Sequence, residues 1–517
     1  MRRSSETGAL LGSVRVIMFV GVLSICDDMG NGFSSGLLDQ HLLIGTAEAL
    51  PMVVDMAAYF GRRIDAVLKN NGSAVWDRIL ETECGGMNDV LYQLYRVTAA
   101  PLHLRLAHLF DKQSWFGGLL NGTDILAGHH ANTHLALTVG GATRADVLGD
   151  SAYAGAVSFF SKTLSQAHAY ATGGSNYREF WNAAHSQGAS LFSATDHFAG
   201  HDNEESCTTY NFLKIQQHLF RWSAAPEAME MYSHSMENGV LGIQHSEPGV
   251  MIYLLPLGNG VTKGNSSRGW GTPLNSFWCC YGTGIESFSK LADSIYFKAT
   301  TSDGLTVARY VSSTLNYVLQ DGAVFSMTQQ STVNFNQSAT FTVTKVRQAS
   351  AGSAATAAPL DMRLRVPSWA GKGSTVTLNG NKVGAIAAGC YVVVTGHVWK
   401  AGDVVAVKFP TKVVLRALDD RGNSCSSKGL ACVASFMYGD VLLVGLEHTL
   451  GASNELVVPS ADPSAWVAED PASEARKIRF TAKTAHRTVT LMPLSEVIEE
   501  RYTVYYNITV AGGASKQ

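Results

Sequence analysis

The first three hundred residues carry apolar side chains at helical spacing. In TTYNFLKIQQHLFRW (208–222), apolar residues recur on one helical face, at Phe212, Ile215, Leu219 and Trp222. The same period runs through NDVLYQLYRV (88–97) and GIESFSKLADSIYF (284–297). Glycine pairs are expected to separate the helices, at residues 85–86, 140–141 and 173–174.

After about residue 300 the period changes from 3.6 to 2. DMRLRVPSW (361–369), CYVVVTGHVW (390–399) and DVVAVKF (403–409) have the alternation of strands, and Asn379-Gly380 is a hairpin-turn signal. Residues 347–359, rich in Ala and Ser, indicate a loop or linker.

The two periods together predict a multidomain α + β chain. We expect a helical domain over residues 36–300, followed over residues 301–517 by one or two antiparallel β-sandwiches. We expect residues 1–35 to be a leader-like or a non-homologous segment, in which Arg2 and Arg3 precede the apolar stretch 16–26.

Five N-x-S/T tripeptides accompany this leader-like start, and the combination favours a secreted glycoprotein. They begin at Asn71, Asn121, Asn265, Asn336 and Asn507. Among the eight cysteines, Cys425 and Cys432 enclose a Gly/Ser/Lys loop and would form one surface disulfide in a secreted protein.

Composition excludes two classes of partner. The 517 residues have a formal net charge of -3, whereas a nucleic-acid-binding face needs clustered basic residues. No run of 18 or more apolar residues occurs, so we expect no membrane span.

Two short patterns offer metal ligands. NEESC places Glu205 two positions before Cys207, and FWCCYGTG contains the adjacent pair Cys279 and Cys280. One carboxylate and three thiolates suit tetrahedral Zn²⁺. Glu205 and Cys207 would point the same way on an extended segment, whereas the cysteine pair needs a turn, for which nearby glycines supply backbone freedom. The alternative is unrelated buried thiols beside a chance acidic residue.

Two further segments carry candidate chemistry. Glu179 lies in NYREFW, where contact with aromatic side chains would raise its pKa toward the range of a general acid. The alternative is a solvated glutamate on an amphipathic turn. His130, in GHHANTH, is a polar group able to line a sugar site, although a lone histidine is more often structural.

Long segments of the chain resemble glycoside hydrolase family 127, and in particular its plant-type members. The resemblance rests on ETECGGMNDVLYQLYRVT, HANTH, HAYATGG, EESCTTYNFLKIQQHLFRW, NGVLGIQHSEPGVMIYLLPLG and SFWCCYGTGIESFSKLADSIYF. It extends from about Gly36 to the segment LMPLSEVIEERYTVYYNI near the end of the chain.

The resemblance implies a β-L-arabinofuranosidase-like enzyme with an (α/α)6 barrel followed by β-sandwich domains. Its implied zinc ligands are Glu205, Cys207, Cys279 and Cys280, with Cys279 also the nucleophile. Glu179 matches the family's acid/base and His130 a histidine that contacts the substrate. The implied reaction is retaining hydrolysis of arabinofuranosyl glycans or glycoproteins through a thioglycosyl intermediate.

The chain departs from the family at its amino-terminal end. Early helices of the family's barrel have no counterpart, and a family histidine is absent before GLLDQ, where the chain reads MGNGFSS. The competing hypotheses are a truncated chain that keeps zinc and binds carbohydrate without catalysis, and a structural zinc protein without a sugar site.

Overall fold

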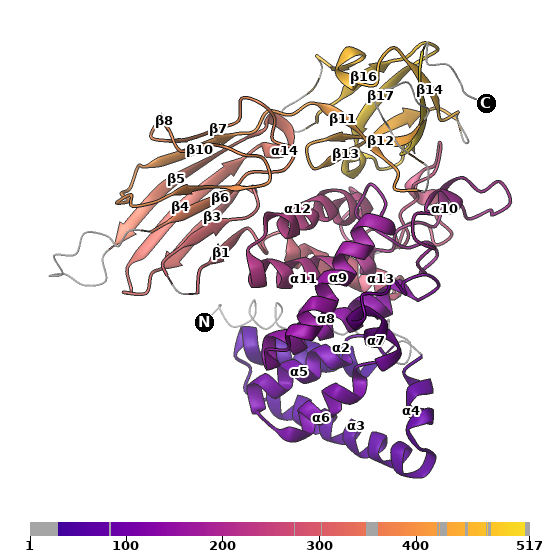
Figure 1. The fold of residues 1–517 in the computed structure, drawn as a ribbon, viewed down its shortest axis with the longest axis vertical. Helices are drawn as coiled ribbons and strands as arrows, with labels where there is room; N and C mark the ends of the chain where they lie inside the picture. Colours follow the sequence, from indigo (N-terminus) through magenta and orange to yellow (C-terminus); the bar gives the residue numbers. More distant parts are fainter. Residues whose placement is uncertain are drawn as a thin grey trace, which may run out of the picture.

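The computed structural model describes residues 29–511, with gaps at 82–83, 273, 301, 348–359, 421–422, 424–431, 450–452, 472 and 474–476. Helices α2 to α13 occupy one end of the molecule. The strands form two groups at the other end, together with the short helix α14 (Val333–Asn336) (Figure 1). The predicted fold class, a helical domain followed by β domains, is confirmed. Most of the leader-like segment and the loop 348–359 lie outside the described residues.

The helical part runs from α2 to α13. Its helices are α2 (Met29–Asp39), α3 (Ala49–Asn71), α4 (Ser73–Ile79), α5 (Met87–Thr98), α6 (Pro101–Phe110), α7 (Gln113–Leu120), α8 (Ala131–Leu148), α9 (Ser151–Ala167), α10 (Gly188–Phe192), α11 (Ser206–Ser223), α12 (Pro226–Ser235) and α13 (Cys279–Ser287). Within the described residues, no helix combines the length and apolar character needed to cross a bilayer.

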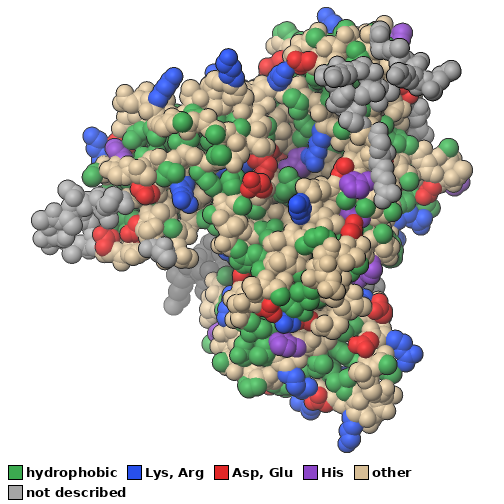
Figure 2. Space-filling view, viewed as in Figure 1, with side chains coloured by type: hydrophobic (Ala, Val, Ile, Leu, Met, Phe, Trp, Pro, Cys, Tyr) green, Lys and Arg blue, Asp and Glu red, His purple; other side chains and the backbone are tan. Residues whose placement is uncertain are grey.

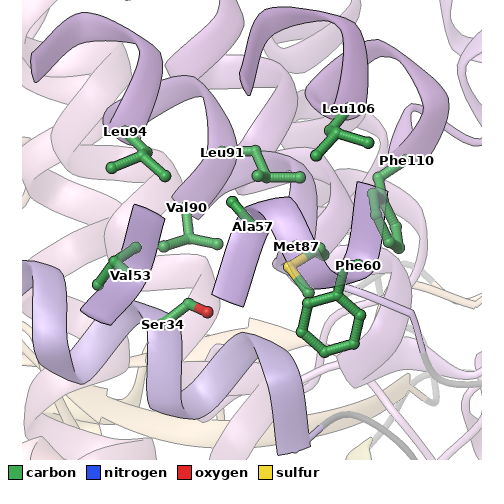
Figure 3. Close-up of a pocket in the computed structure, with 10 residues that line it drawn as sticks. All are labelled: Ser34, Val53, Ala57, Phe60, Met87, Val90, Leu91, Leu94, Leu106 and Phe110. Carbon is green, nitrogen blue, oxygen red and sulfur yellow. The ribbon is translucent and has the colours of Figure 1, made fainter. Parts of the chain in front are cut away.

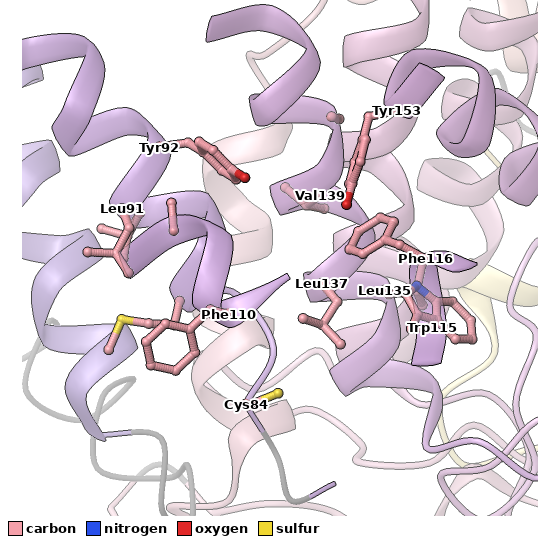
Figure 4. Close-up of a cluster of buried hydrophobic side chains, with 14 of the residues drawn as sticks. Cys84, Leu91, Tyr92, Phe110, Trp115, Phe116, Leu135, Leu137, Val139 and Tyr153 are labelled. Carbon is pink, nitrogen blue, oxygen red and sulfur yellow. The ribbon is translucent and has the colours of Figure 1, made fainter. Parts of the chain in front are cut away.

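The helical core forms where α8, which is buried on nearly all sides, packs against the apolar face of α5. Figure 4 shows Leu137 and Val139 on α8 facing this core, with Phe116 packed against Tyr153 at a ring distance of 4.8 Å. Gly140 and Gly141 lie inside α8, so the predicted helix boundary there is wrong. They serve close packing, because a Cβ at Gly140 would lie 2.1 Å from Asn88 Oδ1.

The helix predicted over residues 284–297 ends early. After α13 a 3-10 turn reaches Lys290, and strand β1 begins at Tyr296. Phe288, expected on the buried stripe, is 49% exposed. The apolar pattern beyond Lys290 therefore belongs to a turn and a strand.

The first β unit is a sandwich of two sheets. Its strands are β1 (Tyr296–Lys298), β2 (Leu305–Val307), β3 (Ser313–Val318), β4 (Val324–Ser331), β5 (Ser338–Arg347), β6 (Met362–Arg365), β7 (Thr375–Leu378), β8 (Asn381–Lys382), β9 (Tyr391–Val394) and β10 (Val404–Lys408). Sheet β1-β2-β6-β9 packs against sheet β3-β4-β5-β10-β7-β8 through one apolar core. The predicted turn joins β7 to β8, with positive φ at Asn379 and Gly380.

The second β unit is one nine-stranded sheet. It contains β11 (Val413–Ala417), β12 (Cys432–Tyr438), β13 (Val441–Glu447), β14 (Glu455–Val458), β15 (Val467–Glu469), β16 (Phe480–Lys483), β17 (Thr488–Pro493), β18 (Arg501–Thr503) and β19 (Tyr506–Val510). The expectation of purely antiparallel pairing is wrong, because β2 pairs with β6 and β14 with β19 in parallel. Cys432 is disulfide-bonded, and Cys425, its predicted partner, lies outside the described residues.

The second β unit shares a core with the loops of the helical domain. Ile252, Leu255 and Leu257 pack in one cluster with Leu494 and Tyr502 of the second β unit. Buried Lys263 strengthens this contact by donating hydrogen bonds from Nζ to the carbonyls of Leu494 and Val497, at 3.2 and 2.5 Å. The segment that precedes α13 therefore rests on the last part of the chain.

The cavity shown in Figure 3 is structural. It lies among α2, α3, α5 and α6, is lined almost entirely by apolar side chains, and has a volume of about 10 Å³, which is too small for a sugar. On the molecular face shown in Figure 2, basic and acidic side chains are interspersed, in keeping with the small net charge.

Candidate active site

Two helix N-termini meet at the four predicted metal ligands. Glu205 precedes α11 and Cys207 is its second residue, while Cys279 and Cys280 are the first two residues of α13. Only Glu205 keeps the predicted extended backbone, and the predicted turn at the cysteine pair is wrong. A helix N-terminus carries partial positive charge, which favours thiolates and carboxylates.

The nearby glycine has a packing role in place of the predicted turn. A Cβ at Gly284 would lie 1.7 Å from Met251 Sδ, so this glycine lets α13 approach the segment that holds Met251.

Asn176 holds the start of α11. Its Oδ1 accepts hydrogen bonds from the Glu205 backbone N–H at 2.9 Å and from Thr208 Oγ1 at 2.8 Å.

The spacing of the four side chains fits a tetrahedral metal ion. One ligand atom from each residue lies within 4.8 Å of all the others. Cys280 Sγ is 3.3 Å from Cys207 Sγ, 4.0 Å from Cys279 Sγ and 3.0 Å from Glu205 Oε1. Tetrahedral Zn–S bonds of about 2.3 Å would separate two sulfurs by about 3.8 Å, which is within this range.

The electrostatics of the ligands also fit a bound cation. Burial raises the pKa of Glu205, Cys207 and Cys280 well above their usual values, and Glu205 Oε2 is buried without a hydrogen-bond partner. Hydrogen bonds from Cys207 and Cys280 instead lower the pKa of Cys279. A dication at this position would supply the missing partner and would favour the ionised form of every ligand.

Glu179 lies at the tip of a tight hairpin turn. Tyr177 and Phe180 exchange backbone hydrogen bonds of 2.9 and 3.0 Å, and the two residues between them, Arg178 and Glu179, have φ values of 46° and 73°. Two successive positive φ values characterise a type I′ turn, for which Asn and Gly are the usual residues. A glutamate is uncommon in this conformation, so its neighbours must hold the turn in place.

The surroundings of Glu179 are more polar than the sequence suggested. Its Oε1 accepts a 2.7 Å hydrogen bond from the Tyr253 hydroxyl, and its Oε2 lies 3.7 Å from His130 Nε2. The neighbouring His130 ring is the main cause that lowers the pKa of Glu179, with smaller contributions from Tyr253 and Arg268. The expectation that aromatic contact raises this pKa is therefore wrong.

The aromatic neighbours of Glu179 divide between the core and the surface. Trp181 is buried and stacks on Trp115 at 5.9 Å, whereas Phe180 is 47% exposed and lies edge-on to the His130 ring. His130 immediately precedes α8, where its Nδ1 accepts a hydrogen bond from the Thr133 backbone. His130, at the start of α8, therefore lies beside Glu179 at the tip of the hairpin.

Tyr253 connects Glu179 to the four candidate metal ligands. Its hydroxyl lies 2.7 Å from Glu179 Oε1 and 3.5 Å from Cys279 Sγ, so these two atoms are at most 6.2 Å apart. Sequence reasoning did not single out Tyr253, Arg268 or Trp278, although all three lie within or beside the segments that carry the family resemblance. The structure brings the six predicted site residues into one group.

The fold is that of glycoside hydrolases. The chain superposes with a TM-score of 0.66 on a family 127 β-L-arabinofuranosidase from Geobacillus stearothermophilus T6, at 17% identity over 93% of this chain and 80% of that one. A solved structure described as a glycoside hydrolase gives 0.71, at 14% identity over 98% and 89% of the two chains. A further family 127 β-arabinofuranosidase gives 0.66, at 17% identity over 93% and 76%.

Family models complete the assignment. The catalytic-domain model of the family 127 β-L-arabinofuranosidases matches residues 31–293, and its middle-domain model matches residues 304–411. None of the curated protein sequences compared with the chain matches it. The chain belongs to glycoside hydrolase family 127, a family of glycosidases.

Proposed function

We propose that the protein is a retaining glycoside hydrolase that cleaves β-L-arabinofuranosides, with Cys279 as nucleophile and Glu179 as acid/base. The observation that carries the mechanism is the Tyr253 hydroxyl, which limits the separation of Glu179 Oε1 and Cys279 Sγ to 6.2 Å. Retaining enzymes hold their two catalytic groups about 5–5.5 Å apart, whereas inverting enzymes need about 6.5–9.5 Å for an intervening water. The sugar is inferred from the family.

In the first step, Cys279 Sγ attacks the anomeric carbon and forms a C–S bond while the C–O bond to the leaving group breaks. Glu179 gives its proton to the departing oxygen. In the second step, Glu179 accepts a proton from a water molecule, whose oxygen attacks the same carbon and releases the thiolate. Two inversions produce net retention, and both catalytic groups return to their starting states.

Zn²⁺ is the metal that the donor set favours, held by Glu205, Cys207, Cys279 and Cys280. When bound, the ion would keep the Cys279 sulfur ionised at neutral pH. His130, which lies beside Glu179, is proposed to contact the substrate. The Tyr253 hydroxyl lies within hydrogen-bonding reach of both the Glu179 carboxyl and the Cys279 sulfur, and it donates its single proton to one of them at a time.

The catalytic assignment predicts different behaviour for two variants. Cys279→Ser should reduce turnover to background, because a serine hydroxyl is much less ionised than a thiol. Glu179→Gln should lose about 10²–10⁴-fold on unactivated substrates but keep glycosylation by aryl arabinofuranosides, whose leaving groups need little protonation. Azide, which needs no base, should then partly restore the Glu179→Gln rate, measured as aryl-alcohol release.

Wild-type activity of either variant on an unactivated arabinofuranoside would overturn its assigned role. The competing non-catalytic hypothesis predicts a separate result, in which the unaltered protein binds a β-L-arabinofuranoside by calorimetry but releases no sugar.

The metal assignment predicts about one zinc per chain by elemental analysis. Cys207→Ser should lower the zinc content and the Tm together, because metal binding contributes to folding free energy. Cys390→Ser, which alters an exposed free thiol away from the ligands, is the matched control and should keep both values. A metal-free preparation with full Tm and activity would contradict the assignment.

A further inference from the structure

Arg268 is an exposed cation beside the proposed catalytic groups. Its guanidinium stacks over Trp278, at 4.5 Å from the ring centre, and lies 5.6 Å from the centre of the Tyr253 ring. Trp278 immediately precedes Cys279, and Tyr253 contacts both Cys279 and Glu179. Across the described residues, the Arg268 guanidinium makes no hydrogen bond or ion pair, so its N–H donors are available to a ligand.

Backbone hydrogen bonds fix the position of Arg268 relative to the turn that carries Glu179. Arg268 lies in a β-turn closed by a 2.9 Å hydrogen bond from Gly269 N–H to the Ser266 carbonyl. Buried Asp202 fixes this turn, because its Oδ1 accepts a 2.8 Å hydrogen bond from Ser267 N–H. The carbonyl of the same Asp202 accepts the Arg178 N–H at 3.0 Å, next to Glu179. One residue therefore positions both turns.

Burial indicates which part of a substrate would meet Arg268. The metal ligands lie at the inner side of the site, where Cys207 is 1% and Cys280 0% exposed. On the outer side, Phe180 and Trp278 are each 47% exposed, and Arg268 is exposed as well. A sugar whose anomeric carbon reaches Cys279 lies on the inner side, and these exposed side chains lie between it and the solvent.

We propose that Arg268, supported by Trp278, binds the leaving-group portion of the substrate by donating hydrogen bonds to its hydroxyl groups. This proposal rests on the proposed glycosidase function. A guanidinium stacked on an aromatic ring has its plane fixed and its edge N–H groups free, which suits paired hydroxyls of a sugar. The chemical class recognised is a glycosyl leaving group, as opposed to a small alcohol.

Two substrates separate this role from a general effect on catalysis. Methyl β-L-arabinofuranoside has a leaving group too small to reach Arg268, whereas an arabinofuranosyl-arabinose disaccharide has one with several hydroxyls. We expect Arg268→Ala to lower the ratio of kcat/KM for the disaccharide to that for the methyl glycoside about tenfold, mainly through KM. Arg268→Lys should recover only part of the ratio, because an ammonium lacks the planar fork.

Trp278 should act through Arg268. Trp278→Ala is therefore expected to lower the same ratio, the double variant should be no worse than Arg268→Ala, and Trp278→Phe should restore most of the ratio. Zinc content and Tm report whether the neighbouring Cys279 is disturbed. Arg63→Ala is the matched control, because Arg63 is an exposed arginine stacked on Tyr59 in α3, and it should keep the ratio.

An equal loss on both substrates, or no loss on either, would overturn the role of Arg268. Failure of the proposed function has a different signature, which is no turnover of either substrate by the unaltered protein. In that case, calorimetric titration of the disaccharide into the unaltered protein and Arg268→Ala still tests the inference. A Kd about tenfold weaker in the variant would support it, and equal or absent binding would overturn it.

Discussion

At the scale of single residues, the acid/base position depends on polar contacts that its neighbours in sequence do not reveal. Tyr177, Phe180 and Trp181 suggested an apolar setting for Glu179, yet the side chains that reach its carboxylate come from residues 130 and 253. Glu179 makes these contacts from the hairpin turn, where Arg178 and Glu179 both have positive φ values. No periodicity predicts such a turn, because its two residues are not turn formers.

This geometry makes the pH dependence of catalysis testable. The first step needs protonated Glu179, so kcat/KM on an unactivated substrate should fall as pH rises above the pKa of that carboxyl. His130 is the main cause that lowers this pKa, so His130→Ala should raise it and move the alkaline limb of the pH profile to higher pH. The pH of half-maximal kcat/KM measures the shift independently of any loss of substrate binding. A limb that stays in place or moves to lower pH would contradict the assignment.

At the scale of elements, the sequence predicted helices well where an apolar stripe was long. The stripes over 88–97 and 208–222 match α5 and α11. Two short patterns offered the four candidate metal ligands, the family resemblance joined them into one set, and the structure brings them together. Helix ends were harder, because a glycine can end a helix or let two helices approach. Gly140 and Gly284 both lie inside helices, and only the partner across the contact shows why.

The packing role of Gly140 predicts a clear contrast between two glycines. Gly140→Ala should destabilise the protein by about 1–3 kcal/mol, because its methyl group would overlap buried Asn88. Asn88 Nδ2 donates to Asp111 at 3.0 Å and to the Leu137 carbonyl at 3.1 Å, so it has little freedom to move. Gly155→Ala in α9, where nothing lies within 4 Å, should be neutral or stabilising by up to about 1 kcal/mol. Chemical unfolding measures both values, and equal effects would contradict this account.

At the scale of the whole molecule, the second β unit is part of the support of the candidate active site. The change of period near residue 300 located the β units, but alternation along a strand does not say which sheet it joins or which surface it covers. The parallel pairs β2–β6 and β14–β19 and the core shared with residues 252–261 are long-range features. They depend on tertiary contacts that local sequence does not encode.

Buried Lys263, at the contact between the second β unit and the helical domain, should make the stability of the protein depend on pH. Burial lowers the pKa of Lys263 to about 7, with Glu500 opposing the shift, whereas a lysine in the unfolded chain titrates near 10.4. Between about pH 7 and 10 the unfolded chain binds a proton that the folded chain does not. The free energy of unfolding attributable to this group therefore rises with pH, by up to about 1.4 kcal/mol per unit.

We expect the stability of the unaltered protein to increase relative to Lys263→Met as pH rises from 7 to 10, as measured by denaturant unfolding. Lys382→Met, which replaces an exposed lysine on β8, is the control. A stability difference between the unaltered protein and Lys263→Met that is constant over this range would show that Lys263 is charged in the folded state.

The shared core also sets the order in which the enzyme can mature during its synthesis. A ribosome releases α11, α13 and all four metal ligands more than two hundred residues before it completes β17 to β19. Until then, the apolar side chains of residues 252–261 lack their partners from the second β unit. During synthesis the helical domain therefore exposes this apolar surface near its thiols. A chain interrupted before β17 would contain every proposed catalytic residue but would expose apolar side chains that chaperones bind.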